Sequence, residues 1–210
     1  MTDWRSVPIP KRMRALARDR RGYPVPFNVL RDSDGLPHFT VNDSIRQARC
    51  LKEKRCAICG ARLGKPMWFV GGPRSAFHKY GAYLDSALHH ECMTYALRVC
   101  PWLAAPKYLG RIDDATVDYT KLPEHAVILD YTQIAERPVV FVAVGATGQT
   151  IMERDGLEPP VVKPSRPYVA VEYWQHGEQL PEERGQMLAG LALNPTRFDL
   201  TIAKHGERGR

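Results

Sequence analysis

The chain has 210 residues, of which 44% are hydrophobic and 25% charged, and its formal net charge is +7. A chain of this length can form one ordinary domain or two small ones, with a core that does not depend on disulfides. No window approaches the roughly 20 consecutive apolar residues of a membrane span, and the N-terminal stretch lacks the apolar segment of a secretory signal. We therefore expect a globular protein in the cytoplasm, without membrane association.

Residues 1–54 are rich in Pro, Arg and Gly and predict an N-terminal arm with little regular structure. We expect short strands over residues 25–31 and 38–41, on either side of the turn signal DSDG. Asp43 or Ser44 is a suitable cap for a short helix that runs through residues 46–54.

Two blocks of basic residues lie in this N-terminal half. They are Lys11, Arg12, Arg14, Arg18, Arg20 and Arg21, and then Arg46, Arg49, Lys52, Lys54 and Arg55. Such blocks create a positive field that attracts phosphate backbones, so they are candidate nucleic-acid contacts. A solvated basic surface without a partner is the alternative interpretation.

Residues 55–105 form a second region around two short cysteine motifs. CAICG predicts a tight turn, and KPMWFVGGPRSAF predicts a strand, a Gly-Gly break and a second short strand. YLDSALHHECMTYALRVC predicts a helix that Asp85 or Ser86 caps and that Pro101 ends.

The spacing of the cysteines and histidines in this region predicts a zinc site. A C-x-x-C turn directs Cys56 and Cys59 into the same space, and His89 and Cys92 share one face of the predicted helix because they lie three residues apart. Structural zinc takes four such ligands as two local pairs. Four protein ligands close the coordination shell, which favours a structural over a catalytic metal. A redox pair is the alternative, but no thioredoxin-like βαβ pattern surrounds the motif.

The other cysteines and histidines are less informative. Cys50 and Cys100 are expected to be free thiols. His90 points about 100° away from His89 around a helix, so it is a surface residue, a group behind the metal ligands or a weak candidate for a catalytic base. His78 is a minor candidate for a further ligand.

Residues 120–203 contain three runs rich in β-branched and aromatic residues, HAVILDYTQI, RPVVFVAVGA and RPYVAVEYWQHG, which predict a small, mostly antiparallel sheet. GATGQT lacks the lysine of a phosphate loop and predicts a hairpin turn. LPEERGQMLAGLAL predicts a closing helix with Met187, Leu188 and Leu191 as its apolar stripe. The expected fold class is α+β, with a zinc module joined to this β-rich region.

Three resemblances follow from these motifs. The order of a CAICG knuckle, a hairpin and a helix bearing HHEC resembles treble-clef zinc domains over about residues 54–103. LHHEC superficially resembles the paired histidines of HNH nucleases, although the proline-bearing strand and the later Asn and His of that family are missing. RGYPVPF, CAICG, HHECMTYALRVCP and VEYWQHGEQLPEERGQML together resemble a group of bacteriophage and bacterial proteins, which implies a phage or prophage origin and no particular activity.

Three hypotheses about function result. The first is a non-enzymatic, zinc-stabilised protein that contacts nucleic acid through its basic N-terminal half. In it, Trp68, Phe69 or Tyr80 stack on bases if exposed, with core packing as the alternative. The second is a module that engages a host protein through the β-rich C-terminal part. The third is an HNH-like metal-dependent nuclease that uses His90.

Overall fold

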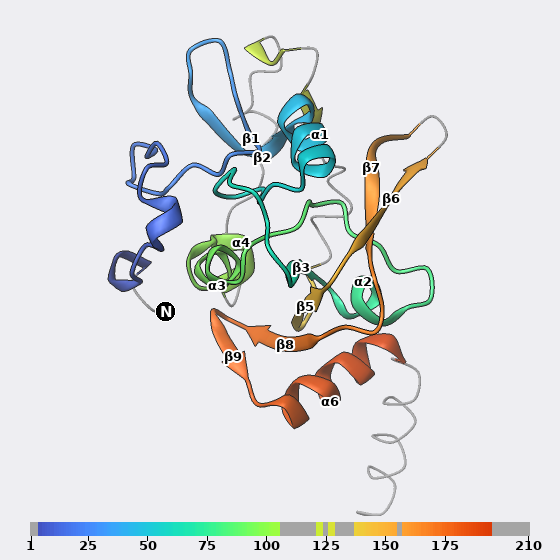
Figure 1. Cartoon of the computed structure of the whole chain (residues 1–210). Coiled ribbons are helices and arrows are strands. Elements are labelled where there is room, and N and C mark those ends of the chain that lie inside the picture. Colours follow the sequence, from blue (N-terminus) through green and yellow to red (C-terminus); the bar gives the residue numbers. More distant parts are fainter. Residues whose placement is uncertain (1–3, 106–120, 124–125, 129–136, 155–156, 195–210) are drawn as a thin grey trace, which may run out of the picture.

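The computed structural model describes residues 4–105, 121–123, 126–128, 137–154 and 157–194 (Figure 1). The fold is mixed α+β with antiparallel sheets, as the sequence predicts. Two short 3-10 helices precede the α-helices: η1 (Trp4–Ser6), η2 (Lys11–Met13), α1 (Ser44–Glu53), α2 (Pro73–Phe77), α3 (His90–Val99), α4 (Pro101–Ala104) and α6 (Glu182–Leu193). The strands are β1 (Val29–Arg31), β2 (Pro37–Asp43), β3 (Met67–Gly71), β4 (Ala126–Ile128), β5 (Phe141–Ala146), β6 (Gln149–Arg154), β7 (Leu157–Pro164), β8 (Ala170–Gln175) and β9 (Glu178–Leu180).

A four-stranded antiparallel sheet with the order β3-β5-β8-β9 lies at the centre of the fold. Trp68 of β3 pairs with Gly145 of β5, and Val142 of β5 pairs with Tyr173 of β8. All six residues of β5 are buried, which is typical of a strand covered on both faces. The region with the cysteine motifs and the C-terminal region therefore share one sheet.

Helices cover both faces of this sheet. Helices α2 and α6 cover one face, where the buried side chains include Phe69, Val142, Val144, Tyr173 and Ala189. Helix α3 covers the other, where they include Trp68, Met93, Leu97, Ala143 and Trp174. Figure 1 shows α6 running alongside β8. Because successive residues of a strand point to opposite faces, Trp68 and Phe69 are both buried, but in different layers.

Two smaller sheets flank the central one. Strands β1, β2 and β4 form the first, and β6 and β7 form a two-stranded ribbon. GATGQT does not form a hairpin between its flanking strands, contrary to the sequence prediction. Strand β5 pairs with β3 and β8, whereas β6 pairs with β7 in the ribbon, which Figure 1 shows rising away from the central sheet. Both neighbours of β5 in the sheet are strands distant in sequence, so a local sequence pattern cannot predict its pairing.

The N-terminal arm packs against α3. Met13 is 2% exposed and lies in one apolar cluster with Tyr95 and Val99 of that helix. The aromatic rings of Trp4 and Tyr23 stack with their centroids 4.0 Å apart at the edge of this cluster. The arm therefore has a fixed position beside α3 despite its low content of regular structure.

Two sequence predictions for residues 55–105 need correction. PRSAF forms α2 rather than a second strand, because Pro73 takes the first helical position, where its missing N–H costs nothing. Helix α3 begins at His90, so neither Asp85 nor Ser86 caps it. The preceding segment is extended, because Leu88 exchanges two backbone hydrogen bonds with Trp68, of 2.8 and 3.0 Å.

The closing helix α6 is confirmed, but its predicted apolar stripe only in part. Leu188 is partly buried and packs against the core, and Leu191 is partly buried, whereas Met187 is 57% exposed. The fully buried positions of the helix are Gly185 and Ala189. These small residues allow α6 to lie close to the sheet.

Within the described residues, no helix has the length and apolar character required to cross a membrane.

Candidate metal centre

The C-x-x-C motif forms a tight backbone turn that brings its two sulfurs together. The N–H of Cys56 donates to the carbonyl of Ala61 at 2.9 Å, and the N–H of Gly60 donates to the carbonyl of Cys56 at 2.8 Å. Gly60 adopts a left-handed conformation with φ +73°, and a Cβ there would lie 2.8 Å from Cδ2 of Phe27. Glycine is therefore required at this position on two grounds, backbone conformation and space.

The other two side chains come from the start of α3. His89 is the N-cap residue of the helix and Cys92 lies in its first turn. The N–H of Met93 donates to the carbonyl of His89 at 2.9 Å, which fixes the three-residue spacing between the two side chains. The pairing of Leu88 with Trp68 sets the point where the helix begins.

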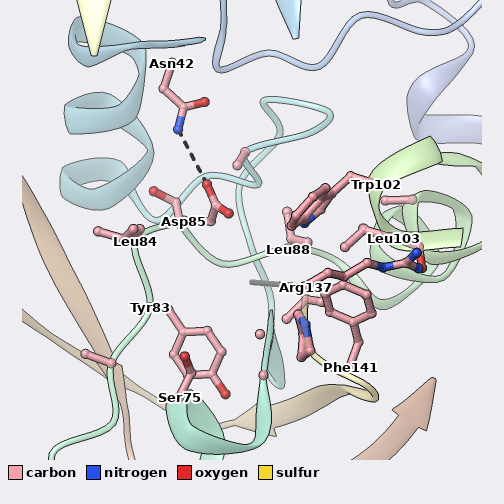
Figure 2. A pocket seen from close by; sticks show the side chains of 18 of the residues that line it. Asn42, Ser75, Tyr83, Leu84, Asp85, Leu88, Trp102, Leu103, Arg137 and Phe141 are labelled. Atoms are coloured by element: carbon pink, nitrogen blue, oxygen red, sulfur yellow. Dashed lines mark hydrogen bonds between the residues drawn. The ribbon is translucent and has the colours of Figure 1, made fainter. Parts of the chain in front are cut away.

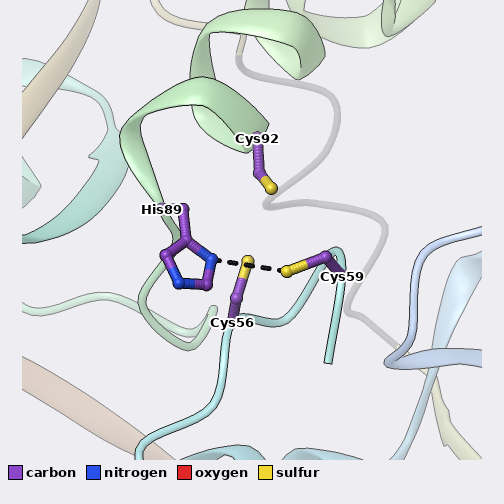
Figure 3. Close-up of side chains that lie close together, drawn as sticks. All are labelled: Cys56, Cys59, His89 and Cys92. Atoms are coloured by element: carbon purple, nitrogen blue, oxygen red, sulfur yellow. Dashed lines mark hydrogen bonds between the residues drawn. The ribbon is translucent and has the colours of Figure 1, made fainter. Parts of the chain in front are cut away.

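Cys56, Cys59, His89 and Cys92 converge in the fold, as the sequence predicts (Figure 3). Each offers one ligand atom, and these four atoms all lie within 4.8 Å of one another. Cys56 and Cys92 are fully buried, whereas Cys59 and His89 are partly accessible. The group has the size and donor set to hold one metal ion.

The hydrogen bonds of His89 assign a role to each of its ring nitrogens. Nδ1 lies 3.3 Å from Sγ of Cys59 and faces the group, while Nε2 lies 3.0 Å from the carbonyl oxygen of Arg62. Because a carbonyl only accepts, Nε2 carries the proton and Nδ1 presents a lone pair. Histidines that bind metals commonly donate their second N–H in this way. No sequence pattern could reveal Arg62, since a backbone carbonyl has no residue-type signature.

The sulfur contacts favour negative charge on one sulfur, that of Cys59, while the pKa values of Cys56 and Cys92 are raised. Hydrogen bonds from the Cys56 and Cys92 thiols lower the pKa of Cys59, and the N–H of Ala61 contributes in the same direction. The corresponding contacts with Cys56 and Cys59 raise the pKa of Cys92. A thiolate at Cys59, supported by neighbouring donors, is what a bound cation would balance.

Three sulfurs and one imidazole nitrogen fit a soft or borderline divalent cation. Zinc takes this set in closed structural sites, whereas Mg²⁺ and Ca²⁺ prefer oxygen ligands. The two local pairs and the second hydrogen bond of His89 agree with such a site. The residues present therefore fit a structural zinc ion better than a catalytic one, because no ligand position is left for water.

The remaining cysteines lie outside this group. Cys50 is 1% exposed within the apolar interior, and burial raises the pKa of its thiol to about 12. Burial also raises the pKa of Cys100, which follows α3. Neither joins the four clustered side chains. His78 is likewise outside the group, and its Nδ1 accepts the N–H of Tyr80 at 3.3 Å.

His90 is turned away from the four clustered side chains. Its Nε2 lies 2.7 Å from Oε1 of Glu172 on β8, and its ring lies 4.5 Å from that of Trp68. Glu172 also accepts the indole N–H of Trp174 at 3.0 Å. The histidine therefore connects the start of α3 to the central sheet. Sequence reasoning missed Glu172, because 82 residues separate it from His90.

The predicted basic residues have different environments. The side chains of Lys11, Arg14, Arg18 and Arg20 are exposed on the arm, and Lys52 and Lys54 are exposed around the end of α1. The others form contacts within the protein: Arg12 with Glu91, Arg21 with Asp19, Arg46 with Asp43, and Arg49 and Arg55 with Glu53.

Comparisons with protein-family models, curated proteins and solved structures found no match to this chain.

Proposed function

We propose that the protein is a zinc-stabilised nucleic-acid-binding protein, without catalytic activity, whose N-terminal arm contacts the phosphate backbone. The observation that carries this proposal is the position of Lys11, Arg14, Arg18 and Arg20, which are exposed on an arm that packs against the candidate metal centre. Phosphate contacts need cations held at the surface and not consumed by internal ion pairs.

The proposed role of zinc is to fix this surface. Met13 of the arm shares an apolar cluster with Cys56 and Cys92. A metal ion that fixes the two cysteines would therefore also fix the surface against which the arm packs. The knuckle around Cys56, the pairing of Trp68 with Leu88, and α3 follow one another in the order of a treble-clef zinc domain. We therefore extend the proposal to a treble-clef-like module at residues 55–105.

The second basic block contributes less to the proposed interface. The guanidinium of Arg46 donates to the carbonyl of Phe27 at 3.0 Å, and that of Arg55 donates to the carbonyl of Gly60 at 2.9 Å. These side chains support the knuckle and α1. Lys52 and Lys54 remain exposed and would extend the contact beyond the arm.

The aromatic residues support phosphate contacts over base stacking. Trp68 is 6% exposed and Phe69 is 1% exposed, so neither is accessible to a base. Tyr80 is 74% exposed, but it lies beyond α2 rather than on the arm. We therefore expect binding with little sequence preference and a strong dependence on salt. The sequence resemblance extends the proposal to a phage or prophage protein in the cytoplasm of its host.

The test compares two charge-matched double variants. Affinity for a labelled duplex and a labelled single strand is measured by fluorescence anisotropy at about 50 and 200 mM salt. Arg14→Gln with Arg18→Gln should weaken binding of any sequence and reduce the slope of log affinity against log salt by about 2.

The control removes the same charge from exposed residues outside the arm, Lys79 and Arg184. Lys79→Gln with Arg184→Gln should bind almost as tightly as the wild type, since distant surface charges are largely screened at these salt concentrations. Equal losses of affinity in the two double variants would show that binding depends on net charge and not on the arm. No binding by the wild type at low salt would overturn the proposal.

The β6–β7 ribbon supports a second candidate, a module that binds another protein. Ile151 is 42% exposed and Met152 is 37% exposed, and as neighbours on a strand they point to opposite faces of the ribbon. Each exposed side chain leaves apolar surface that a partner protein would cover. Two results together would favour this candidate. The wild type would not bind nucleic acid, and Ile151→Ser would disrupt a complex with another protein.

A nuclease has less support. His90 is engaged with Glu172, and among the described residues only one group of side chains is arranged to hold a metal ion. An HNH-like reaction needs a catalytic ion in addition to a structural one. Metal-dependent cleavage of DNA that is lost in His90→Ala, with zinc retained, would revive this alternative.

A further inference from the structure

A cavity of about 870 Å³ lies between the metal-binding region and the central sheet. Its volume is in the range of sites that hold small organic ligands. The walls are mainly apolar and include Leu88, Trp102 and Phe141, while Asn42, Asp85 and Arg137 provide polar groups (Figure 2). None of the functional residues discussed above requires this space.

Asp85 is the acidic group of this cavity. Asp85 is exposed, yet the surrounding protein atoms raise the pKa of its carboxyl by desolvation. Both observations fit a carboxyl on the wall of an open cavity, which many protein atoms surround although solvent reaches it. In such surroundings a partner that donates hydrogen bonds stabilises the ionised form.

The protein provides only a weak partner for this carboxylate. Asn42 donates to Oδ1 of Asp85 at 3.5 Å, the long limit of a hydrogen bond, and Asn28 donates to Oδ1 of Asn42 at 3.2 Å. The second contact holds the amide of Asn42 in position. Within the described residues no other hydrogen bond or ion pair to Asp85 is present, so most of its acceptor capacity is available to a ligand or to solvent.

The basic group of the cavity does not neutralise Asp85. Arg137 donates to the carbonyls of Leu103, at 2.7 Å, and Ala105, at the end of α4. Its guanidinium also lies 5.5 Å from the centre of the Phe141 ring. In Figure 2, Arg137 lies beside Phe141, across the cavity from the Asn42–Asp85 pair. Two opposite charges therefore line one cavity without forming an ion pair with each other, an arrangement that leaves both available to a ligand.

We propose that this cavity binds a small planar molecule that presents two adjacent N–H groups to Asp85, as an amidine, a guanidinium or a guanine base does. A carboxylate has two acceptor oxygens in one plane, which match two parallel N–H donors. Trp102 supplies flat apolar surface for the rest of the ligand. Asn42 holds the carboxylate so that its second oxygen remains available.

The test uses matched pairs of probes on the full chain, by isothermal titration calorimetry. Benzamidine is compared with benzamide, and guanosine with inosine, since the second member of each pair lacks the adjacent donor pair. Binding of benzamidine but not benzamide identifies an amidine or guanidinium ligand, whereas binding of guanosine but not inosine identifies a nucleobase. In either case Asp85→Asn should weaken binding about tenfold or more, because a charge-assisted contact is lost.

Thermal stability without a probe separates a ligand site from a structural role. If Asp85 serves a ligand, Asp85→Asn keeps the shape of the side chain, removes a desolvated charge, and leaves the melting temperature unchanged or higher. If the carboxylate supports the fold through Asn42, the same variant melts at a lower temperature. Asp34→Asn, which changes an exposed aspartate paired with Lys121, controls for loss of charge alone.

Two results would overturn the proposal. One is a wild-type protein that binds neither benzamidine nor guanosine at millimolar concentration. The other is an Asp85→Asn variant that binds either probe as tightly as the wild type. The nucleic-acid proposal is unaffected by both, since it rests on residues of the arm.

Discussion

The contacts of His89 and His90 outside the four clustered side chains separate the roles of these two neighbouring residues. His89 directs Nδ1 inward because its Nε2 donates to Arg62, whereas His90, one residue later, pairs with Glu172. Two adjacent histidines therefore have different functions although their sequence context is almost the same. The consequence for metal binding can be measured directly.

Replacing His89 should remove the metal, whereas replacing His90 should not. His89→Ala deletes a ligand atom, and we expect its zinc affinity to fall by more than about a hundredfold, since residues behind a ligand alone contribute about 10–100-fold. His90→Ala loses the contact with Glu172 and should retain one zinc per chain. Elemental analysis of both purified variants tests this difference, and equal zinc loss in the two would contradict the assignment.

Asp85 and Asp32 should affect stability with opposite dependence on pH. Desolvation raises the pKa of Asp85 above the ordinary 3.8, so the native state binds more protons than the unfolded state as the pH rises past that value. The free energy of unfolding of the wild type therefore falls as the pH rises. Between acid and neutral pH, Asp85→Asn should become more stable relative to the wild type. The hydrogen bond from His38 lowers the pKa of Asp32. The ionised Asp32 therefore stabilises the fold above about pH 3.8, and this stabilisation is lost as the pH falls further.

Denaturant unfolding of wild type, Asp85→Asn and Asp32→Asn over a pH series checks both signs. At neutral pH, Asp85→Asn should be at least as stable as the wild type and Asp32→Asn less stable. Both differences should diminish toward acid pH, where the wild-type carboxyls are protonated. Because each variant is compared with the wild type at the same pH, protonation of the metal ligands cancels. A difference for Asp85→Asn that does not change with pH would contradict the shift.

At the scale of elements, helix ends and close contacts decide which parts of the fold can be predicted from the sequence. The start of α1 can, because the Asp43 carboxylate accepts the N–H of Arg46 three residues later, a local cap. The start of α3 cannot, because it is set by the pairing of Leu88 with Trp68, 20 residues earlier. Local signals at Asp85 predicted a cap there, and long-range strand pairing prevailed.

Helix α6 provides a matched test of close packing. A Cβ at Gly185 would overlap the ring of Tyr173, whereas a Cβ at Gly190 would meet nothing within 4 Å. Gly185→Ala should therefore lower the free energy of unfolding by about 1–3 kcal/mol through overpacking. Gly190→Ala should raise it by up to about 1 kcal/mol, since alanine favours a helix interior.

The two glycine variants are compared by denaturant unfolding at constant metal content. Both introduce the same methyl group into the same helix, so helix propensity cancels and the difference reports the contact with Tyr173. Equal effects of the two substitutions would show that α6 does not pack on the sheet through Gly185.

At the scale of the whole molecule, the two candidate sites differ in how far their residues lie apart in sequence. The metal centre uses two local pairs whose spacing is visible in the sequence, so its four members could be predicted. The cavity combines Asn42 of β2, Asp85 before α3 and Arg137 before β5, which are far apart in the sequence. No spacing rule identifies such a set. The local sequence around Asp85 indicates only a helix cap, because its neighbours in the cavity are distant in the sequence.

Metal removal should release the arm before it disrupts the central sheet. Met13 contacts the cluster that contains Cys56 and Cys92, whereas Val142 and Tyr173 belong to a separate cluster between the sheet and its helices. We expect a chelator to lower the melting temperature, since structural zinc contributes directly to folding. Trypsin should then cleave first at the exposed Arg14, Arg18 and Arg20.

Limited proteolysis followed by mass spectrometry identifies the order of cleavage with and without chelator. Returning zinc should protect the arm again, whereas Mg²⁺ should not, because sulfur-rich sites bind it weakly. Early cleavage within the central sheet would mean that the metal supports the whole fold, as β3 connects the two parts. Cleavage of the arm at the same rate with and without zinc would separate the arm from the metal centre. The basic surface would then need no metal, which would remove the proposed link between zinc and nucleic-acid binding.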